Sequence, residues 1–493
     1  AMILAVAAPL VACGSNSPEV QPADLVLRGG RVVTVDEELP EGTAIAVRGG
    51  FVDRVGSDEE IAFHIGPDTR VVELKGRLAI PGLIEGHGHF LSLGDSKMIL
   101  DLSSARSWDE IVSRVATAAE EAEPGAWIRG RGWHQEKWDE EATRSVEGAP
   151  VHESLSAVSP ENPVVLGHAS GHAAFANAKA MELAGLTRET ENPPGGELVR
   201  SGDGELTGLL RETAQRAVSE ALSNAMSERL PEEVDATRRR MVELAGKEAL
   251  SKGITSFHDA GVSFETIEFY KQLEDEGALP VRLYAMVRYQ SNEEMEARLP
   301  EYYMELEGND FLTVRSIKRQ IDGALGSHGA WLLEPYEDLP GSVGLVLEPE
   351  EEIQETARIA IQHGYQVNTH AIGDRANREV VTVFEQLEKA RATRGKDASV
   401  PSALPHRIEH TQMIRSEDIK RLARLGVAAC VQPHNMILDI NMIDESVGPR
   451  GRWTYAYRDM LDAGVPVLFS SDAPVCDPSP LVGIHALVTR QRS

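Results

Sequence analysis

Two histidines stand one residue apart, directly after a short apolar run near residue 80. The run is Leu-Ala-Ile-Pro-Gly-Leu-Ile-Glu-Gly, and His87 and His89 follow it. Because side chains at positions i and i+2 of a strand point to the same side, the two imidazoles are expected to face one point. Neutral imidazole is a common protein ligand for zinc. An isolated His-x-His is often incidental, so the prediction of a metal site depends on whether later strands end in matching ligands.

Residues that can bind a metal also stand at the ends of later apolar runs. Lys318, His370 and His410 each end such a run, and Asp472 follows another. A lone histidine like His370 is more often structural, but the joint pattern favours a shared role. Several imidazoles and a carboxylate that converge at one place describe a catalytic metal site with an open position.

The strands that must position these residues alternate with charged helical segments. Strands followed by helices at this spacing indicate βα units and a parallel sheet. Besides the His-x-His strand we expect seven strands, at residues 254–257, 281–286, 314–318, 366–370, 406–410, 427–431 and 465–469. Eight βα units predict an α/β fold of the (β/α)8 TIM-barrel type, whose active site lies at the carboxyl ends of the strands.

We expect the barrel at residues 79–493, with a smaller domain before it and a large insertion after its first strand. Residues 23–78 hold short strands, at 25–27, 31–35, 44–47, 51–55 and 70–74. Two of the connections are Arg-Gly-Gly, which indicates hairpins, so this part predicts a small antiparallel β-sandwich. The interval of about 95–250 is too long for one βα step and should hold its own elements, with helices at 108–121 and 231–251.

Five motifs in sequence order carry a family resemblance. They are Pro-Gly-Leu-Ile-Glu-Gly-His-Gly-His-Phe, Ile-Lys before Asp-Gly-Ala-Leu-Gly-Ser, His-Ala-Ile-Gly-Asp-Arg, Arg-Ile-Glu-His, and Ser-Asp-Ala-Pro-Val. Together they resemble the amidohydrolase superfamily. More narrowly they are similar to the YtcJ-like group (amidohydrolase family 3), which includes N-substituted formamide deformylases. The resemblance covers the chain from about residue 24 to its end.

What the resemblance implies is a binuclear centre, usually with two zinc ions. His87, His89 and Asp472 would bind one ion, and His370 and His410 the other. Lys318 would be carboxylated by CO₂ and would bridge both ions, because a free ammonium group cannot bind a cation. If Lys318 is instead a buried lysine paired with an acid such as Asp322, a mononuclear site built mainly on His87, His89 and Asp472 follows.

The reaction implied is hydrolysis of an amide-type, non-peptide carbon–nitrogen bond in a small molecule. A hydroxide between the metals would attack the carbonyl carbon, and Asp472 would pass its proton to the departing nitrogen. Three alternatives stay open: a deaminase of an amino-heterocycle, a phosphotriesterase-like or lactonase-like hydrolase, and a lipid-anchored binding protein without catalysis. Ammonia release would favour the first, and absence of bound metal the last.

Other residues are candidates for the substrate pocket. Some stand where the chain departs from its relatives, which have an aspartate in place of His134 and an arginine in place of His328. For His172 a structural role is equally open, and for Arg458 a place on a helix surface is slightly favoured. The pocket candidates are His172, Trp133, Asp322, His328 and Arg458.

Composition limits the partners. The chain has 493 residues, 49 basic and 78 acidic, so its formal charge is −29. This charge argues against nucleic acid or an anionic membrane surface as a partner and fits a solvated acidic surface. A small-molecule substrate is expected, and homo-oligomerisation is left open. With three cysteines there is no disulfide framework.

Residues 1–22 are expected to form a lipoprotein signal and tether. An apolar run ends in Leu-Val-Ala before Cys13, which resembles a bacterial lipobox. Lipid on Cys13 would anchor the protein in the bacterial cell envelope, whereas the alternative is an apolar leader without a lipid. Relatives also continue beyond the position of Ser493. We therefore expect a poorly anchored last helix, an incomplete sandwich and reduced stability.

Overall fold

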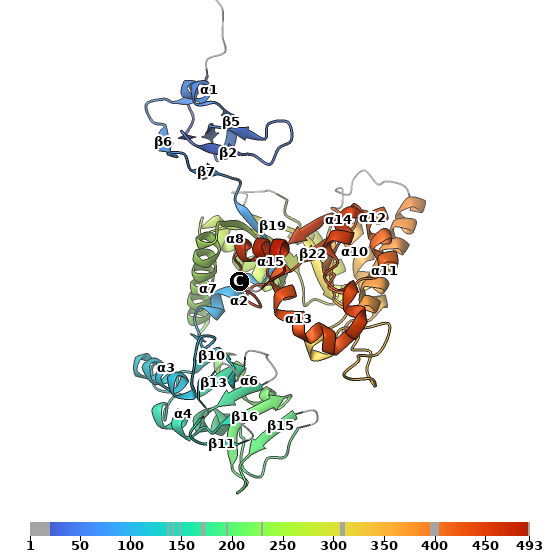
Figure 1. Ribbon diagram of the computed structural model, residues 1–493. Coiled ribbons are helices and arrows are strands. Elements are labelled where there is room, and N and C mark those ends of the chain that lie inside the picture. Colours follow the sequence, from blue (N-terminus) through green and yellow to red (C-terminus); the bar gives the residue numbers. More distant parts are fainter. Residues whose placement is uncertain are drawn as a thin grey trace, which may run out of the picture. The chain divides into compact units, whose positions relative to one another are not determined.

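The computed structural model describes residues 20–491, except 136–137, 141, 147–148, 169–172, 194–195, 228–229, 306–310 and 395–403. The predicted lipid site Cys13 and the pocket candidate His172 therefore lie outside the described residues. The chain divides into two compact units, Ala1–Leu83 and Ile84–Ser493 (Figure 1). Within the described part of the chain, no helix is both long and apolar enough to cross a membrane.

The first unit contains two small sheets. One has the strand order β5-β4-β1-β6 and the other β3-β2-β7. The apolar side chains of Val26 and Ile61 are buried in this unit, together with small alanines. The packing of the sheets into a sandwich stays a prediction. The elements are β1 (Leu25–Arg28), β2 (Arg31–Val33), β3 (Glu41–Gly42), β4 (Ala44–Arg48), β5 (Phe51–Gly56), α1 (Asp58–Ile61), β6 (Arg70–Glu73) and β7 (Leu78–Ala79).

Only one of the two predicted Gly-Gly hairpins is present. Strands β4 and β5 pair antiparallel across Gly49 and Gly50, whose φ angles of 58° and 84° suit a type I′ turn. The prediction of a β1–β2 hairpin was wrong, because β1 pairs antiparallel with β4 and parallel with β6. A Cβ at Gly30 would lie 2.5 Å from the Arg77 carbonyl oxygen, so this glycine permits a close backbone approach. The unit is therefore mixed and not antiparallel throughout.

The second unit confirms the predicted TIM barrel. Its eight parallel strands are neighbours in sequence order, from β8 through β17 to β23. The backbone N–H of Asp472 donates to the carbonyl of His87 at 2.8 Å, and that of His89 to the carbonyl of Ala473 at 2.7 Å. The loop after the last strand thus bonds to the first strand, and the barrel nearly closes. The strands are β8 (Leu83–Gly88), β17 (Ile254–Val262), β18 (Arg282–Val287), β19 (Leu312–Gln320), β20 (Gln366–Ala371), β21 (Arg407–His410), β22 (Ala428–Val431) and β23 (Val467–Phe469).

Helices alternate with these strands, as a βα pattern requires (Figure 1). Helix α8 illustrates why: Ser263 caps its first turn, and Ile267, Tyr270 and Leu273 form its buried face. The predicted helix at 231–251 is α7. The helices are α2 (Phe90–Ser96), α7 (Pro231–Ser251), α8 (Phe264–Asp275), α9 (Asn292–Tyr302), α10 (Glu350–Gln362), α11 (Asp374–Arg394), α12 (Ser416–Leu425), α13 (Pro433–Val447), α14 (Tyr457–Asp462) and α15 (Pro480–Thr489).

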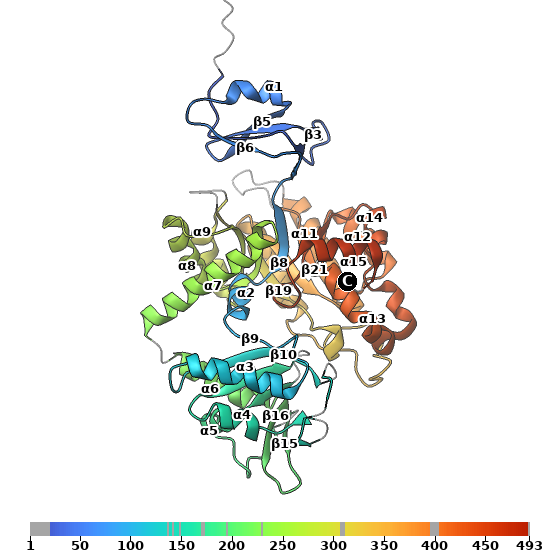
Figure 2. The ribbon, with the colours of Figure 1, turned by 60° about the vertical axis from the view of Figure 1, so that its left-hand side comes forward.

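Between β8 and β17 the chain forms a further six-stranded sheet with its own helices (Figure 2). The sheet order is β15-β16-β14-β13-β10-β9, and α3 is the predicted helix at 108–121. Trp108, Leu166 and Phe175 are buried in its core. The elements are β9 (Leu100–Asp101), α3 (Trp108–Glu121), β10 (Ile128–Trp133), β11 (Ser145–Val146), β12 (Ala149–Pro150), α4 (Glu153–Val158), β13 (Val164–His168), β14 (Ala173–Ala176), α5 (Ala178–Leu183), β15 (Gly196–Arg200), β16 (Leu206–Glu212) and α6 (Gln215–Ser227).

Candidate metal centre

The six predicted metal ligands lie on or directly after five barrel strands, toward the carboxyl ends. Strand β19 continues two residues beyond Lys318, so this lysine stands just inside the strand instead of ending it. The positions are His87 on β8, His89 directly after β8, Lys318 on β19, His370 on β20, His410 on β21 and Asp472 after β23.

Asp472 faces the His-x-His pair. Its Oδ1 lies 3.5 Å from His87 Nε2 and 3.3 Å from His89 Nε2, and these three side chains form a group that can hold a metal ion. This oxygen is buried and accepts no hydrogen bond. Burial acts to raise the pKa of Asp472, but its interactions with His89, His87 and His410 outweigh that effect, so its pKa lies below the ordinary value. The carboxylate is therefore ionised and has an oxygen free to bind a cation.

The other two histidines stand beside this group. The His410 ring centroid lies 4.9 Å from that of His87 and 4.3 Å from that of His370. Burial lowers the pKa of all three imidazoles, and the nearby Lys318 cation lowers them further. They are thus neutral, as metal binding requires. The Nε2 atom of His370 is buried without a hydrogen-bond partner.

Lys318 completes the cluster from β19. It is 2% exposed, and its Nζ lies 3.3 Å from His87 Nε2. Burial lowers the pKa of Lys318 to about 8, so a substantial fraction of the amine is neutral near pH 8. Among the described residues it forms no ion pair with Asp322. The oxygens of Asp322 instead accept backbone N–H bonds of 2.8 to 3.0 Å from Trp331, Ile372 and Gly373.

A buried ion pair orients His87 from the interior of the barrel. Glu409 Oε2 lies 2.5 Å from His87 Nδ1, and Glu409 Oε1 lies 2.8 Å from Arg407 Nη2. Arg407 also donates to the Gly86 carbonyl at 2.7 Å and lies 3.0 Å from His258 Nδ1. A carboxylate on Nδ1 fixes the tautomer, so the lone pair of Nε2 points toward Lys318 and Asp472, where a metal could bind it. The sequence offered Arg407 and Glu409 only as part of a motif; their i, i+2 spacing on one strand face was the signal for a shared role.

His410 shares strand β21 with Glu409, although consecutive strand residues point to opposite faces. The backbone of His410 is left-handed, with a φ of 74°, which ends the strand and re-aims its side chain. Gln432 then holds the ring, because its Oε1 lies 2.7 Å from His410 Nδ1. Sequence reasoning did not assign a role to Gln432.

Glu85 ties the first strand to the loop after the last one. Its carboxylate accepts from the backbone N–H and hydroxyl of Ser471 at 2.8 and 2.7 Å, and from the His87 N–H at 3.2 Å. Burial raises the pKa of Glu85 to about 7. These bonds place Asp472, the neighbour of Ser471, opposite the His-x-His pair. Glu85 was a second positioning residue that sequence reasoning missed.

The pocket candidates lie in different surroundings. Trp133 is buried in the core of the six-stranded sheet that the insertion forms, where its Nε1 donates to the Leu166 carbonyl at 2.8 Å. His328 Nε2 lies 3.0 Å from Asp338 Oδ2. Asp322 is the candidate that the structure brings to the centre, since its Oδ1 lies 3.6 Å from His370 Nε2.

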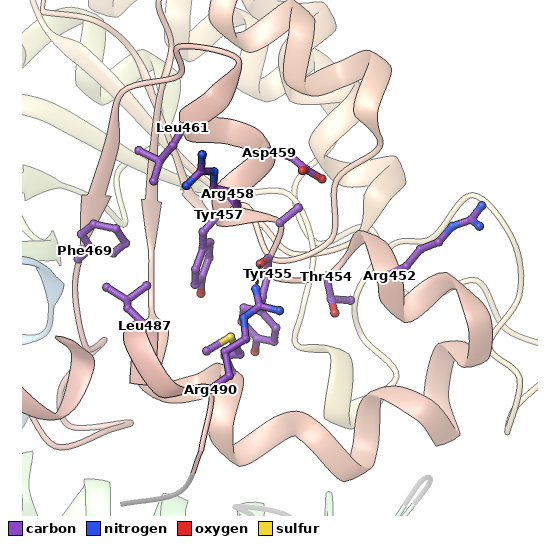
Figure 3. Close-up of a pocket in the computed structure, with 12 residues that line it drawn as sticks. Arg452, Thr454, Tyr455, Tyr457, Arg458, Asp459, Leu461, Phe469, Leu487 and Arg490 are labelled. Atoms are coloured by element: carbon purple, nitrogen blue, oxygen red, sulfur yellow. Dashed lines mark hydrogen bonds between the residues drawn. The ribbon is translucent and has the colours of Figure 1, made fainter. Parts of the chain in front are cut away.

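Arg458 lies on α14 and lines a cavity of about 540 Å³. Its side chain is 82% exposed and pairs with Asp462 at 2.8 Å. Figure 3 shows Tyr455, Tyr457 and Arg490 beside the same cavity. Of the described residues that line it, none is a predicted metal ligand, so the structure does not bring Arg458 to the metal centre.

The donor set fits a divalent metal. Two buried donor atoms, His370 Nε2 and Asp472 Oδ1, have no hydrogen-bond partner, although buried polar atoms are normally paired. Three neighbouring imidazoles are held neutral, and the carboxylate is ionised. Nitrogen and carboxylate donors together are typical of zinc and related divalent ions.

Comparison with known proteins agrees with a metal-binding site. The "Amidohydrolase family" model matches residues 70–493. Protein LONG AFTER FAR-RED 3 of Arabidopsis thaliana is 31% identical over 95% of this chain and 78% of its own. Putative amidohydrolase YtcJ of Bacillus subtilis (strain 168) is 28% identical over 95% of this chain and 84% of its own. N-substituted formamide deformylase of Arthrobacter pascens is 27% identical over 96% of this chain and 84% of its own.

A solved structure agrees in fold. The crystal structure of an uncharacterized metal-dependent hydrolase from Pyrococcus horikoshii OT3 superposes with a TM-score of 0.74 and 26% identity, over 94% of this chain and 86% of that one. The predicted enzyme class and the use of a divalent metal are thereby confirmed. From its motifs, its barrel and these relatives, the chain belongs to the amidohydrolase family, as a YtcJ-like metal-dependent hydrolase.

Proposed function

We propose that this protein hydrolyses an amide-type, non-peptide carbon–nitrogen bond in a small molecule. The observation that carries the proposal is the Asp472 carboxylate, whose buried Oδ1 lies within 3.5 Å of both His87 Nε2 and His89 Nε2 and accepts no hydrogen bond. Support for the bond type comes from the relative named N-substituted formamide deformylase, which aligns with 96% of this chain.

Two zinc ions would be held by the six clustered side chains. His87, His89 and Asp472 are suited to one ion, and His370 and His410 to the other. Bound divalent metal supplies a water molecule of lowered pKa as nucleophile and polarises the scissile carbonyl.

Lys318 would contribute as a carbamate shared by both metal sites. The neutral amine attacks CO₂, a C–N bond forms, and one proton is released. Two features favour this reaction: burial lowers the pKa of Lys318 to about 8, and no described acid forms an ion pair with the amine. Its 3.3 Å separation from His87 Nε2 puts the amine beside a ligand of the site.

Asp472 would move the proton during the reaction. Its carboxylate is ionised before the reaction, so it can accept a proton from the attacking water. It then donates that proton to the leaving nitrogen, which departs as a neutral amine. Glu409 and Gln432 would keep His87 and His410 oriented as metal ligands beside it.

The test is metal quantification coupled to a substrate screen. Purified protein should contain close to two zinc ions per chain and should release amine from N-formyl, N-acyl or cyclic amides. Removal of CO₂ during apoprotein reconstitution should lower metal uptake if the Lys318 carbamate forms. Hydrolysis confined to phosphotriesters or lactones, or ammonia release from amino-heterocycles alone, would contradict the proposal.

A further inference from the structure

Arg288, the residue after β18, lies at the end of the barrel where the predicted metal ligands stand. Val287 pairs with Ile317, so Arg288 follows at the level of Lys318 on the neighbouring strand. Met286 points into the barrel, because its Sδ lies 3.2 Å from the buried amide nitrogen of Asn368. Side chains alternate along a strand, and Arg288 is two residues beyond Met286.

The guanidinium of Arg288 has a neutral partner only. Its Nη2 donates to Gln320 Oε1, and within the described residues no carboxylate lies within ion-pairing distance of it. Two acids, Glu348 and Glu352, line the same cavity of about 370 Å³. They have other partners: Glu348 lies 3.8 Å from Arg319, and Glu352 accepts from Asn292 at 2.8 Å. In a strongly acidic protein, an arginine without an ion-pair partner among the described residues therefore stands at the carboxyl end of a barrel strand.

The backbone at Gly261 approaches the Arg288 side chain closely. A Cβ at Gly261 would lie 2.6 Å from Arg288 Cδ, so any other residue at this position, where φ is +132°, would displace the arginine. On another side, the guanidinium carbon lies 5.1 Å from the Tyr289 ring centroid.

We propose that Arg288 binds a carboxylate group of the substrate, which makes N-formyl or N-acyl amino acids the substrate class. Arginine presents two parallel N–H donors that match the two oxygens of a carboxylate. Gln320 occupies one donor and sets the direction of the fork. This inference rests on the proposed amide hydrolysis, and it specifies which amides are taken.

The test compares N-formyl-leucine with N-formyl-leucinamide, which lacks the negative charge. Zinc-loaded wild-type protein should show a KM for the acid about 10 to 100 times lower than for the amide, the range expected for a charge-assisted hydrogen bond. Arg288→Gln should remove this preference by raising KM for the acid, with kcat and zinc content little changed. Arg288→Lys should restore part of it. Arg282→Gln removes an exposed charge from the other end of β18 and should change neither KM.

Other results would overturn the proposal. Equal KM values for acid and amide in the wild type would do so, as would a loss of zinc in Arg288→Gln, which would indicate that Arg288 supports Lys318. If wild-type protein hydrolyses neither compound, the proposed function fails, and calorimetric binding of both compounds to the zinc-loaded protein still decides the role of Arg288. Tighter binding of the acid that depends on Arg288 supports it; equal binding of both compounds rejects it.

Discussion

Asp472 combines two properties that rarely occur together: ionisation and a buried oxygen that accepts no hydrogen bond. Asp472→Asn keeps an oxygen donor for the metal but cannot accept a proton from water. We expect zinc content close to that of the wild type and a fall in kcat of about 100-fold or more, the usual contribution of a positioned acid–base group. Zinc analysis and amide turnover measure both quantities. Asp462→Asn, an exposed carboxylate on α14, is the matched control; near-normal turnover in the Asp472 variant would refute the role.

Glu409 acts on the metal through His87. Glu409→Gln keeps the size of the side chain but removes the charge that faces His87 Nδ1 and Arg407. We expect zinc affinity to fall about 10- to 100-fold, as for other partners of metal-binding histidines. Stability should fall by about 3–5 kcal/mol, because Arg407 is left as a buried unpaired charge.

Chelator competition and thermal unfolding measure the two effects of Glu409→Gln separately. Glu417→Gln, on the exposed side of α12, should change neither. A variant that loses stability but keeps its zinc affinity would limit Glu409 to a structural role.

The identity of the ligands was readable from residue types at strand ends, but the residues that orient them were not. Glu409 and His87 are separated by 322 positions in the chain. No local pattern reports a contact of that kind. The left-handed backbone at His410 was equally hidden, since it departs from strand periodicity.

Among the elements, β17 and β21 are linked through the barrel interior by His258 and Arg407, with 3.0 Å between Nδ1 and Nη1. Burial, with the charge of Arg407, lowers the pKa of His258 to about 3. In the unfolded chain this pKa is near 6.5. Below pH 6.5 the unfolded state therefore binds the proton and the folded state does not, so stability falls as the pH is lowered from about 6.5 to 3.

We expect His258→Gln, which keeps an acceptor for Arg407, to weaken this pH dependence by a few kcal/mol at the acid end. Urea unfolding of both proteins at a series of pH values gives the comparison. The variant and the wild type should be similar in stability above pH 7. Parallel curves for the two proteins throughout would show that His258 is not the group responsible.

Helices α2 and α7 approach closely at Gly94. A Cβ there would lie 2.0 Å from the Met241 carbonyl oxygen. Alanine is the better helix former by about 1 kcal/mol, yet Gly94→Ala should destabilise the protein by about 1–3 kcal/mol through overpacking. Gly483→Ala in α15 is the matched control: its Cβ would meet no atom within 4 Å, so stability should rise. Equal changes in melting temperature for both variants would contradict the tight packing at Gly94.

The elements themselves were largely predictable where apolar runs are long. All eight barrel strands and the helices α3 and α7 stand where periodicity placed them. The connection between β1 and β2 was not predictable, because a Gly-Gly pair indicates a sharp turn but does not indicate in which sheet the next strand lies. At Gly30 a Cβ would lie 2.5 Å from the Arg77 carbonyl oxygen. This crowding depends on the tertiary structure and cannot be read from the local sequence.

At the scale of the molecule, metal and fold are coupled, because the ligands come from five strands around the barrel. Removing the metal should therefore lower the unfolding temperature. Free zinc at 100 to 1,000 times its Kd stabilises a native state by about 3–4 kcal/mol. Differential scanning calorimetry before and after chelation, and after zinc is restored, measures this shift. An unfolding temperature that does not respond to chelation would indicate that the cluster is preformed and weakly bound to metal.

Glu85 and Ser471, which close the barrel next to the metal ligands, are 386 positions apart in the chain. The ribosome releases the His-x-His segment with the first barrel strand and the segment with Asp472 only after the last one. During synthesis, the complete set of ligands therefore exists only after almost the whole barrel has emerged. Until then His87 and His89 lack the carboxylate that completes their site, so this group of three ligands can take up a metal only after Asp472 has emerged.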